Sequence, residues 1–330
     1  MRNMSIVFLE KILNVFCGEI FVYLHDYFLI CNSYNLLNSD GCYCFAKGYS
    51  LKKCKNCLYY DAEVYKRISF INKYLNRIVF IAPSHTPYLI ISMLFPLWKE
   101  KIRIVLHQKL YGKYTENLDL LKSFDKIKFA YVGLPITSKG WNQFLSIIEN
   151  CKSKNSYDFY HFGKEDSILE NVKNIYVDFK QNENGMINSL RENKIDCVIL
   201  WSIWPETYSY VFYECFSANT FIITNNISGN ICEMVKKIGN GIVLESENEL
   251  INLINNPEKL KELINNFKNQ KKFGPMLIKE NQDIIDLTSN ENKNKTVFKN
   301  ITKIKKTIKC KLVELLFIKH YHVKKYNYFY

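Results

Sequence analysis

Glycine and proline are scarce in this sequence, with 12 and 7 among 330 residues, and this excludes collagen-like and low-complexity chains. No apolar run is long enough to cross a bilayer, because the longest, at residues 88–98, falls short of the roughly 20 residues that a spanning helix needs and contains Pro96. The N-terminal residues lack the uninterrupted apolar core and the small-residue cleavage site of a signal peptide. We therefore expect a cytoplasmic protein without a transmembrane helix.

Apolar side chains are plentiful. They make up 48% of the chain, against 23% charged residues, so a packed core can form and wholesale disorder is excluded. A length of 330 residues suits two ordinary domains better than one.

Positive charge is concentrated at the C-terminal end. Of the net charge of +13, residues 293–330 carry +10, from 11 lysines and one acid, Glu314. Aromatic and aliphatic side chains alternate with these lysines, as in segments that lie on an anionic membrane surface. Nucleic-acid binding and a solvated basic helix are the alternatives.

Five of the 11 cysteines fall within 27 residues, at 31–57. In a reducing compartment such a cluster indicates a metal rather than disulfides. Cys54 and Cys57 have the spacing of a zinc knuckle, and Cys42 and Cys44 can complete a tetrahedral structural zinc site, with Cys31 as an alternative ligand. Loop cysteines without a ligand role are the other interpretation.

Short apolar runs alternate with polar stretches of helical length. Most of these runs are continuously apolar, which is typical of strands buried on both faces of a parallel sheet. Their alternation with helices predicts a doubly wound α/β fold, with a domain boundary in the polar stretch at 108–126. The predicted strands are residues 20–24, 78–82, 102–106, 128–132, 158–162, 174–177, 197–200, 220–224 and 241–244.

The most informative motif follows the predicted strand that ends at Leu200. Open α/β sheets bind ligands where a strand ends and a helix begins. Thr207 or Ser209 is placed there to cap the helix, which leaves N–H groups for an anion such as a diphosphate. Glu206 on the turn and Glu214, expected two turns into the helix, could bind hydroxyls of a sugar and a ribose. The alternative is an acid at a helix start and a solvated glutamate.

Two more predicted strands end in polar residues. After the strand that ends at Gly133, Lys139 lies before a helix, where a lysine can meet phosphate charge, although the spacing is not that of a Walker loop. His25 and Asp26 follow the strand at 20–24, where a histidine can carry a proton near neutral pH. A structural histidine is the alternative.

In their order along the chain, these motifs resemble a retaining glycosyltransferase of the GT-B fold, family 4 (glycosyl transferases group 1). Glu206 and Glu214 resemble the E-x7-E motif of its donor domain. Residues 24–27, the cysteine cluster and residues 82–84 resemble the second half of its N-terminal domain, where some members carry similar cysteines. The resemblance covers about residues 19–262.

The resemblance implies a role for each matching residue. Lys139 would neutralise the diphosphate leaving group, Glu206 would hold hydroxyls of the donor sugar, and Glu214 would hydrogen-bond the ribose. His25 would act in catalysis, together with Glu206, by facing the donor sugar from the N-terminal domain. Transfer would need no catalytic metal, so a zinc ion on the cysteines would be structural. The other donor-binding positions would be Gly133 and Lys139 near the diphosphate, Gly163 near the nucleobase, and the backbone amides of Thr207, Tyr208 and Ser209 near the phosphates.

The implied fold class is α/β and GT-B-like, with two Rossmann-like domains of which the N-terminal one is incomplete. Residues 1–120 would form the partial acceptor-side domain with the cysteine cluster, 121–270 the donor domain, and 271–330 a polar linker and basic aromatic tail. The first strands and acceptor loop of the family have no counterpart before Glu19, so we expect a truncated chain or a partner chain that supplies the missing half. Leu134 replaces a frequent arginine, and Asn219 replaces a small residue at a helix-to-strand turn.

The sequence thus predicts a cytoplasmic transferase, peripheral on the inner face of a membrane. It would move a sugar from a nucleoside-diphosphate sugar to a cell-surface glycan or lipid-linked acceptor, as in lipopolysaccharide or capsule synthesis. An inactive nucleotide-sugar-binding protein is the first alternative. A zinc-containing nucleic-acid binder is disfavoured, because the basic charge lies about 240 residues from the cysteines, and we expect no nucleic-acid partner.

Overall fold

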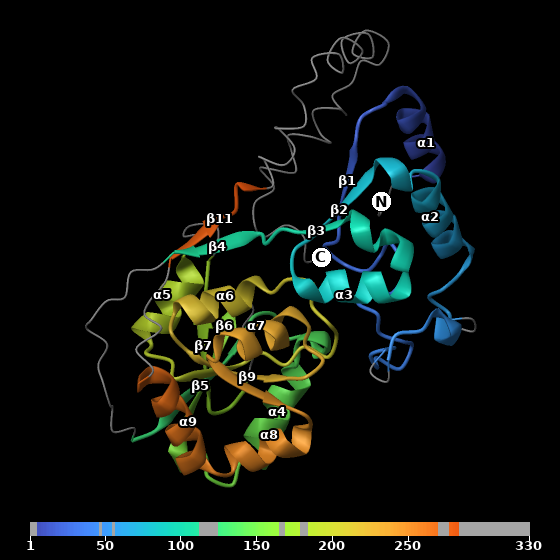
Figure 1. Ribbon diagram of the computed structural model, residues 1–330. Coiled ribbons are helices and arrows are strands. Elements are labelled where there is room, and N and C mark those ends of the chain that lie inside the picture. Colours follow the sequence, from blue (N-terminus) through green and yellow to red (C-terminus); the bar gives the residue numbers. More distant parts are fainter. Residues whose placement is uncertain are drawn as a thin grey trace.

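The computed structural model describes residues 5–45, 48–54, 57–111, 125–164, 169–178, 184–269 and 277–283. Two lobes are visible, a smaller one built from the N-terminal part of the chain and a larger one around a twisted sheet (Figure 1). A short two-stranded sheet lies between them. No helix in the described ranges is long and apolar enough to cross a membrane.

The smaller lobe is a three-stranded parallel sheet in the order β1-β2-β3. Its central strand is buried at all five positions, as its continuous apolar sequence predicts. One face packs on the helices around Phe80 and Trp98, and the other carries a small cluster of Val79, Ile81 and Val105. The strands are β1 (Ile20–Tyr23), β2 (Ile78–Ala82) and β3 (Ile102–Ile104), and the helices are α1 (Ile6–Val15), α2 (Ala62–Lys73) and α3 (His85–Leu94).

The larger lobe is a six-stranded sheet in the order β10-β9-β8-β5-β6-β7, and every neighbouring pair is parallel. Because the order reverses at β5 and β8, the carboxyl ends of these strands open a crevice where such sheets bind ligands. The strands are β5 (Ile127–Val132), β6 (Tyr157–Gly163), β7 (Val172–Tyr176), β8 (Cys197–Ile199), β9 (Phe221–Asn225) and β10 (Gly241–Leu244).

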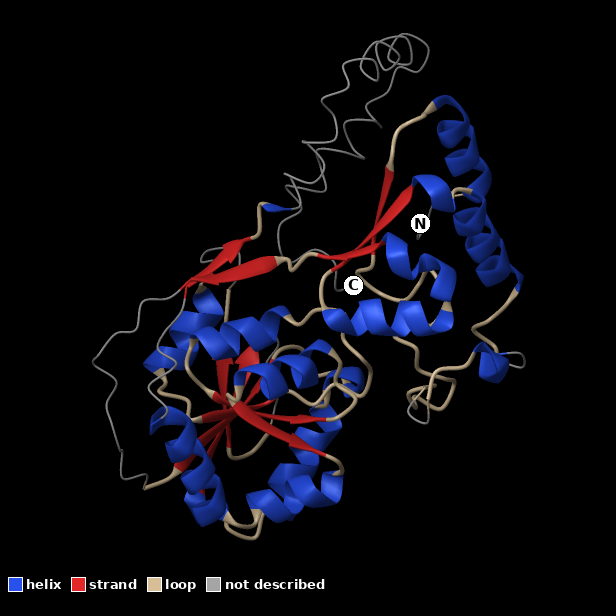
Figure 2. Ribbon diagram, viewed as in Figure 1, coloured by secondary structure: helices blue, strands red, loops and turns tan. Residues whose placement is uncertain are grey.

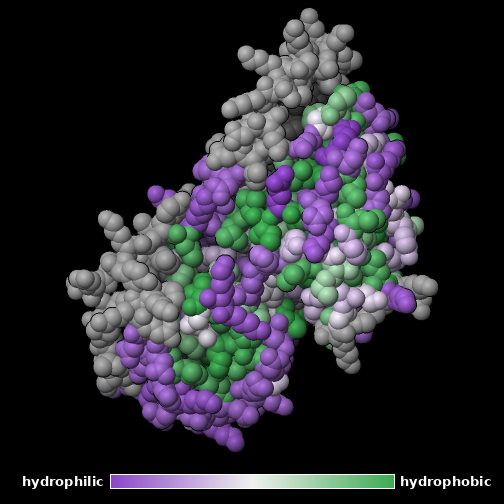
Figure 3. Space-filling model, viewed as in Figure 1, coloured by the Kyte–Doolittle hydropathy of each residue, from purple (hydrophilic) through white to green (hydrophobic). Residues whose placement is uncertain are grey.

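Helices cover both faces of this sheet (Figure 2). One face packs on α4, α8 and α9 around Phe129 and Phe144, and the other packs on α5, α6 and α7 around Phe212 and Ile222. Hydrophilic side chains dominate the end of the larger lobe that lies away from the smaller lobe (Figure 3). The helices are α4 (Trp141–Asn150), α5 (Gly185–Glu192), α6 (Tyr210–Ser217), α7 (Asn230–Ile238), α8 (Glu247–Ile254) and α9 (Pro257–Asn269).

The lobes are joined through an antiparallel pair, β4 (Gln108–Tyr111) and β11 (Leu277–Glu280). Asn281, just after β11, donates from its backbone N–H to the carbonyl of His107 (3.0 Å) and from its side chain to that of Leu106 (2.8 Å). A distant segment of the chain thereby fixes the backbone of the connection between the two parallel sheets.

The α/β class and all nine predicted strands are confirmed, with ends that differ by one or two residues. The strands β4 and β11 were not predicted, because both are short and partly polar and pair outside the main sheets. Asn219 adopts the left-handed conformation expected for its turn, with φ of 62°. The domain limits and the missing N-terminal strands remain predictions. Of the predicted linker and tail at 271–330, only residues 277–283 are described, and they contain β11.

One glycine decides how closely the turn before α4 approaches the end of β8. Gly140 has φ of 90°, and a Cβ there would stand 2.3 Å from the carbonyl oxygen of Trp201. Gly239 has a similar φ of 80°, but nothing lies within 4 Å of the position that its Cβ would take. Substitution at Gly239 therefore tests the effect of the left-handed backbone alone, and substitution at Gly140 adds a steric overlap to it.

We predict that Gly140→Ala destabilises the protein more than Gly239→Ala. Both variants incur about 1–2 kcal/mol for the left-handed backbone, and only Gly140→Ala adds a backbone clash, worth about 1–3 kcal/mol. Thermal denaturation of both variants beside the wild type measures the difference. Equal losses in the two variants would show that the approach to Trp201 does not constrain the fold.

Candidate active site

A buried ion pair brings together two of the predicted donor-site residues. Lys139 ends the short helical turn Thr137–Lys139 after β5, and Glu206 lies in the loop between β8 and α6. The lysine Nζ is 2.8 Å from Glu206 Oε1, and only 4% of the glutamate side chain is exposed. The same ammonium lies 5.3 Å from the ring centre of Trp204. The carboxyl ends of β5 and β8 thus meet in a charged pair that is largely shielded from water.

The backbone of Glu206 is held against the start of α7. Gly229 pairs with Glu206 in a parallel bridge, and the Asn230 N–H donates to the Glu206 carbonyl (2.9 Å). A Cβ on Gly229 would lie 2.5 Å from the Glu206 nitrogen, and its φ of 65° also favours glycine. This close approach fixes the direction in which the Glu206 side chain leaves the loop.

Ser209, rather than Thr207, caps the helix that follows. Its hydroxyl accepts from the N–H of Phe212 (3.3 Å), while its own N–H donates to Asn230 Oδ1 (3.2 Å). The Thr207 hydroxyl instead donates to the backbone carbonyl of His25 in the smaller lobe. Of the amides expected near the phosphates, that of Ser209 is therefore bound within the protein.

The smaller lobe contacts this loop through backbone carbonyls. Tyr27 donates its hydroxyl to the carbonyl of Pro205 (2.9 Å), and Ser84 donates to the carbonyl of Thr207 (2.6 Å). Further along, the Thr86 hydroxyl donates to Glu233 of α7 (3.2 Å). Motifs at 24–27 and 82–84 therefore meet the loop of the E-x7-E motif, and the site lies where the two lobes join.

Glu214 lies about one turn into α6, not two as predicted, and it is buried with 3% exposure. Glu206 is equally buried, and the alternative interpretation of Glu214 as a solvated glutamate is wrong. Buried carboxylates are rare unless they are paired or hydrogen-bonded. Both residues of the motif therefore occupy positions that a surface helix would not supply.

The ends of β5 and β6 are tied together by a histidine that the sequence analysis did not assign to the site. The two ring nitrogens of His161 lie 3.0 Å from the carbonyl oxygen of Gly133 and 3.2 Å from Asn174 Oδ1. A Cβ on Gly163 would stand 2.9 Å from that same Gly133 oxygen. Gly133 itself has φ of 121° and nothing within 4 Å of its Cβ position. Gly133 and Gly163 are thus neighbours, with space beside Gly133.

His25 lies in a column of stacked rings. Its ring centre is 5.3 Å from that of Tyr23 and 5.3 Å from that of His107. His107 in turn stacks on Tyr210, the first residue of α6, at 5.8 Å, and meets Tyr208 edge-on at 4.9 Å. The sequence analysis missed His107, and the only indication of it was its place just after a predicted strand.

Comparison with known proteins identifies the family. The profile of the family described as "Glycosyl transferases group 1" matches residues 105–272, which is about half of the chain and includes Lys139, Glu206 and Glu214. The chain belongs to this family. Among curated protein sequences, none matches the chain significantly.

Solved structures of similar fold support the α/β GT-B architecture of this group 1 chain. WaaG, a glycosyltransferase involved in lipopolysaccharide biosynthesis, is 11% identical with a TM-score of 0.52, over 81% of this chain and 76% of its own. A glycosyltransferase from Rickettsia africae is 15% identical with a TM-score of 0.50, over 68% of each chain. At such low identity these likenesses concern the fold alone.

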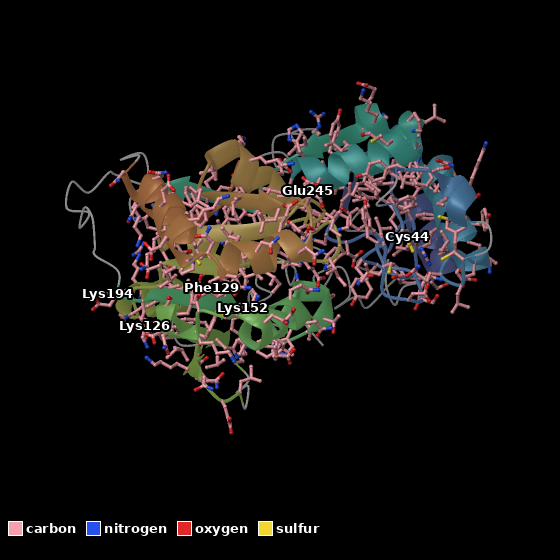
Figure 4. The ribbon with its side chains drawn as sticks, turned by 90° about the horizontal axis from the view of Figure 1, so that it is seen from below. Cys44, Lys126, Phe129, Lys152, Lys194 and Glu245 are labelled. Carbon is pink, nitrogen blue, oxygen red and sulfur yellow. The ribbon has the colours of Figure 1, made fainter. Side chains whose placement is uncertain are left out.

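The cysteine cluster of this group 1 chain lies in the smaller lobe, apart from the large sheet around Phe129 (Figure 4). Burial, and after it the nearby thiols of Cys44, Cys57 and Cys54, raise the pKa of Cys31 to about 12. Cys42 is exposed. Within the described ranges, which include these five cysteines, no group of three or more His, Cys, Asp or Glu side chains is placed to hold a metal ion, and the structural zinc remains a prediction.

Removal of the Lys139 ammonium should leave the buried Glu206 carboxylate without its ion-pair partner and so destabilise the protein. We predict that Lys139→Met lowers the free energy of unfolding by about 2–3 kcal/mol, less than a fully buried pair would lose, because 27% of the lysine side chain is exposed. Adding Glu206→Gln should recover much of this loss, since no charge is then left unpaired. A double-mutant cycle by chemical denaturation measures the coupling. Additive losses would contradict the pairing.

The partly buried His107 at the lobe junction makes stability depend on pH. Burial, and after it the neighbouring His25, lower the pKa of His107 from 6.5 to about 3. Between pH 6.5 and about 3, His107 is protonated in the unfolded chain but stays neutral in the folded protein. The proton therefore favours the unfolded state, and the free energy of unfolding decreases as the pH falls below 6.5.

We therefore predict that His107→Phe, which cannot be protonated, loses less stability than the wild type as the pH falls from 7 to 4. Thermal melting across this range measures the gap between the two proteins. Every other titratable group is common to both, so the change in the gap reports on His107. If the melting temperatures of the two proteins fell in parallel with pH, His107 would not be held neutral in the folded protein.

Proposed function

We propose that this chain is a retaining glycosyltransferase of family 4 that takes its sugar from a nucleoside-diphosphate sugar. The observation that carries the proposal is the meeting of Lys139 and Glu206 at the carboxyl ends of β5 and β8, 2.8 Å apart, beneath residues of the other lobe. A paired cation and carboxylate at the crevice of an open α/β sheet suit a donor with charged phosphates and sugar hydroxyls.

The roles of the two charges differ. The Lys139 ammonium would stabilise the negative charge that develops on the diphosphate as the sugar–phosphate bond breaks. Glu206, with its backbone fixed by Gly229, would accept hydrogen bonds from the donor-sugar hydroxyls and so orient the reacting carbon. On donor binding, the lysine would exchange part of its contact with Glu206 for the phosphates.

The remaining donor contacts follow from the same strand ends. Gly133, with open space beside it, would admit a phosphate close to the backbone, and Gly163 beside it would lie near the nucleobase. Glu214 would bind the ribose. His25, whose backbone carbonyl accepts from Thr207, would face the donor sugar from the smaller lobe. These residues require no catalytic metal ion.

The acceptor proposed is a cell-surface glycan or a lipid-linked saccharide. The basic aromatic tail, residues 293–330, would hold the enzyme on the anionic inner face of the membrane, where lipid-linked acceptors are found. The involvement of WaaG in lipopolysaccharide biosynthesis is in keeping with this class of acceptor. A partner chain that supplies further acceptor-side strands belongs to the same proposal.

The donor class can be identified by ligand-induced stabilisation. We predict that one group among UDP-, GDP- and ADP-sugars raises the melting temperature of the wild type by a few degrees, because a ligand at 100 times its Kd adds about 2.7 kcal/mol to stability. Differential scanning fluorimetry across the panel measures the shift, and incubation with the binding sugar then tests for transfer or hydrolysis.

Two glutamate variants supply the control. Glu214→Gln keeps the shape of the buried side chain and should reduce the shift, whereas Glu149→Gln, on an exposed position of α4, should leave it unchanged. A shift without any sugar transfer would favour the inactive nucleotide-sugar-binding protein. No shift with any donor would overturn the proposed function.

A further inference from the structure

The ring column at the lobe junction joins three segments that are distant in the sequence. Tyr23 and His25 come from the end of β1, His107 comes from the connection between the two parallel sheets, and Tyr210 begins α6. The successive ring planes are nearly parallel, at 9°, 19° and 7°. Aromatic rings stacked in this way attract each other beyond the area that they bury.

We propose that His107 is a positioning residue, whose flat ring holds His25 in the orientation that the transfer reaction needs. The proposal rests on the proposed function, in which His25 faces the donor sugar. The rings of Tyr23 and His107 both stack on the exposed His25 ring, while the Thr207 hydroxyl in the donor loop donates to the His25 backbone carbonyl.

His107 is itself held from several directions. Its carbonyl accepts from the backbone N–H of Asn281 (3.0 Å), directly after β11. Its neighbour Gln108 accepts from the hydroxyl of Tyr208 (3.3 Å), whose ring also meets His107 edge-on. Because its backbone and ring are both fixed, His107 can transmit a fixed orientation to His25. His107 and Gln108 are not among the donor-binding residues that the resemblance implies.

The position of His107 is more specific than core packing requires. An aliphatic side chain of similar size would fill the space, but it would present no flat face to His25 or Tyr210. Burial keeps the His107 imidazole neutral near pH 7, so it adds no charge beside the donor site. The flat shape of the ring is the property that the column uses.

The matched pair His107→Leu and His107→Phe tests this property. Both substitutions are apolar and fill the site, but only phenylalanine restores a flat ring. The first readout is the NMR signal that reports the placement of the His25 ring against Tyr23, the intensity of the NOE cross-peaks between their ring protons, which does not depend on the ring current of residue 107. The chain has only six histidines, and the His25 signal is assigned from its absence in His25→Gln. This readout needs no substrate.

We expect the NOE signal between His25 and Tyr23 to weaken in His107→Leu and to keep its wild-type intensity in His107→Phe. With the donor found in the binding panel, turnover should fall about tenfold or more in His107→Leu, as a misoriented catalytic group would cause. It should return to within about threefold of wild type in His107→Phe, with similar melting temperatures in both variants.

The outcomes separate this proposal from the proposed function. An unchanged His25 signal in His107→Leu, or turnover that is equal in the two variants, would overturn the positioning role. If the wild type neither binds nor turns over any nucleotide sugar, the proposed function fails instead. The His25 signal then still decides whether His107 holds the ring of His25, and a role in transfer is excluded.

Discussion

The site depends on one requirement: the Glu206 carboxylate must stay charged and oriented where little water reaches it. A buried carboxylate without a partner is strongly unfavourable, and Lys139 supplies the partner at 2.8 Å. The ion pair also limits where the loop can lie, because the lysine is fixed at the end of β5. Two glycines then allow the necessary close approaches, Gly140 to the carbonyl of Trp201 and Gly229 to the backbone of Glu206.

The contacts between the lobes converge on the same loop and use mainly its backbone. The hydroxyl groups of Tyr27 and Ser84 donate hydrogen bonds to the carbonyls of Pro205 and Thr207, respectively. The Thr207 hydroxyl in turn donates to the carbonyl of His25. Because these acceptors are backbone atoms, the junction holds the shape of the loop and leaves the Glu206 side chain to its ion pair. The same loop therefore makes the contacts between the lobes and carries the carboxylate of Glu206.

The sequence revealed the parts of the fold that are governed by continuous burial. Strand β2 is apolar and buried at every position, so its run was recognisable, whereas the partly polar β4 and β11 pair with each other outside the main sheets. Glu206 and Lys139 were recognised as candidates from their strand-end positions. Their pairing, the capping by Ser209 and the role of His107 were not, because each depends on how separate strand ends are placed in space.

The connection between the sheets shows why such residues escape sequence reasoning. His107 stands directly before the polar stretch at 108–126, which has the composition of a linker, yet its backbone is bonded to Asn281 and its ring stacks on rings of both lobes. A linker of this kind does not merely join two domains, because its position is set by β11 and its side chain reaches the site. Any movement that separates the lobes must break the ring column and the bonds to the Glu206 loop together. The geometry of the site and the contact between the lobes are thus maintained by the same few residues.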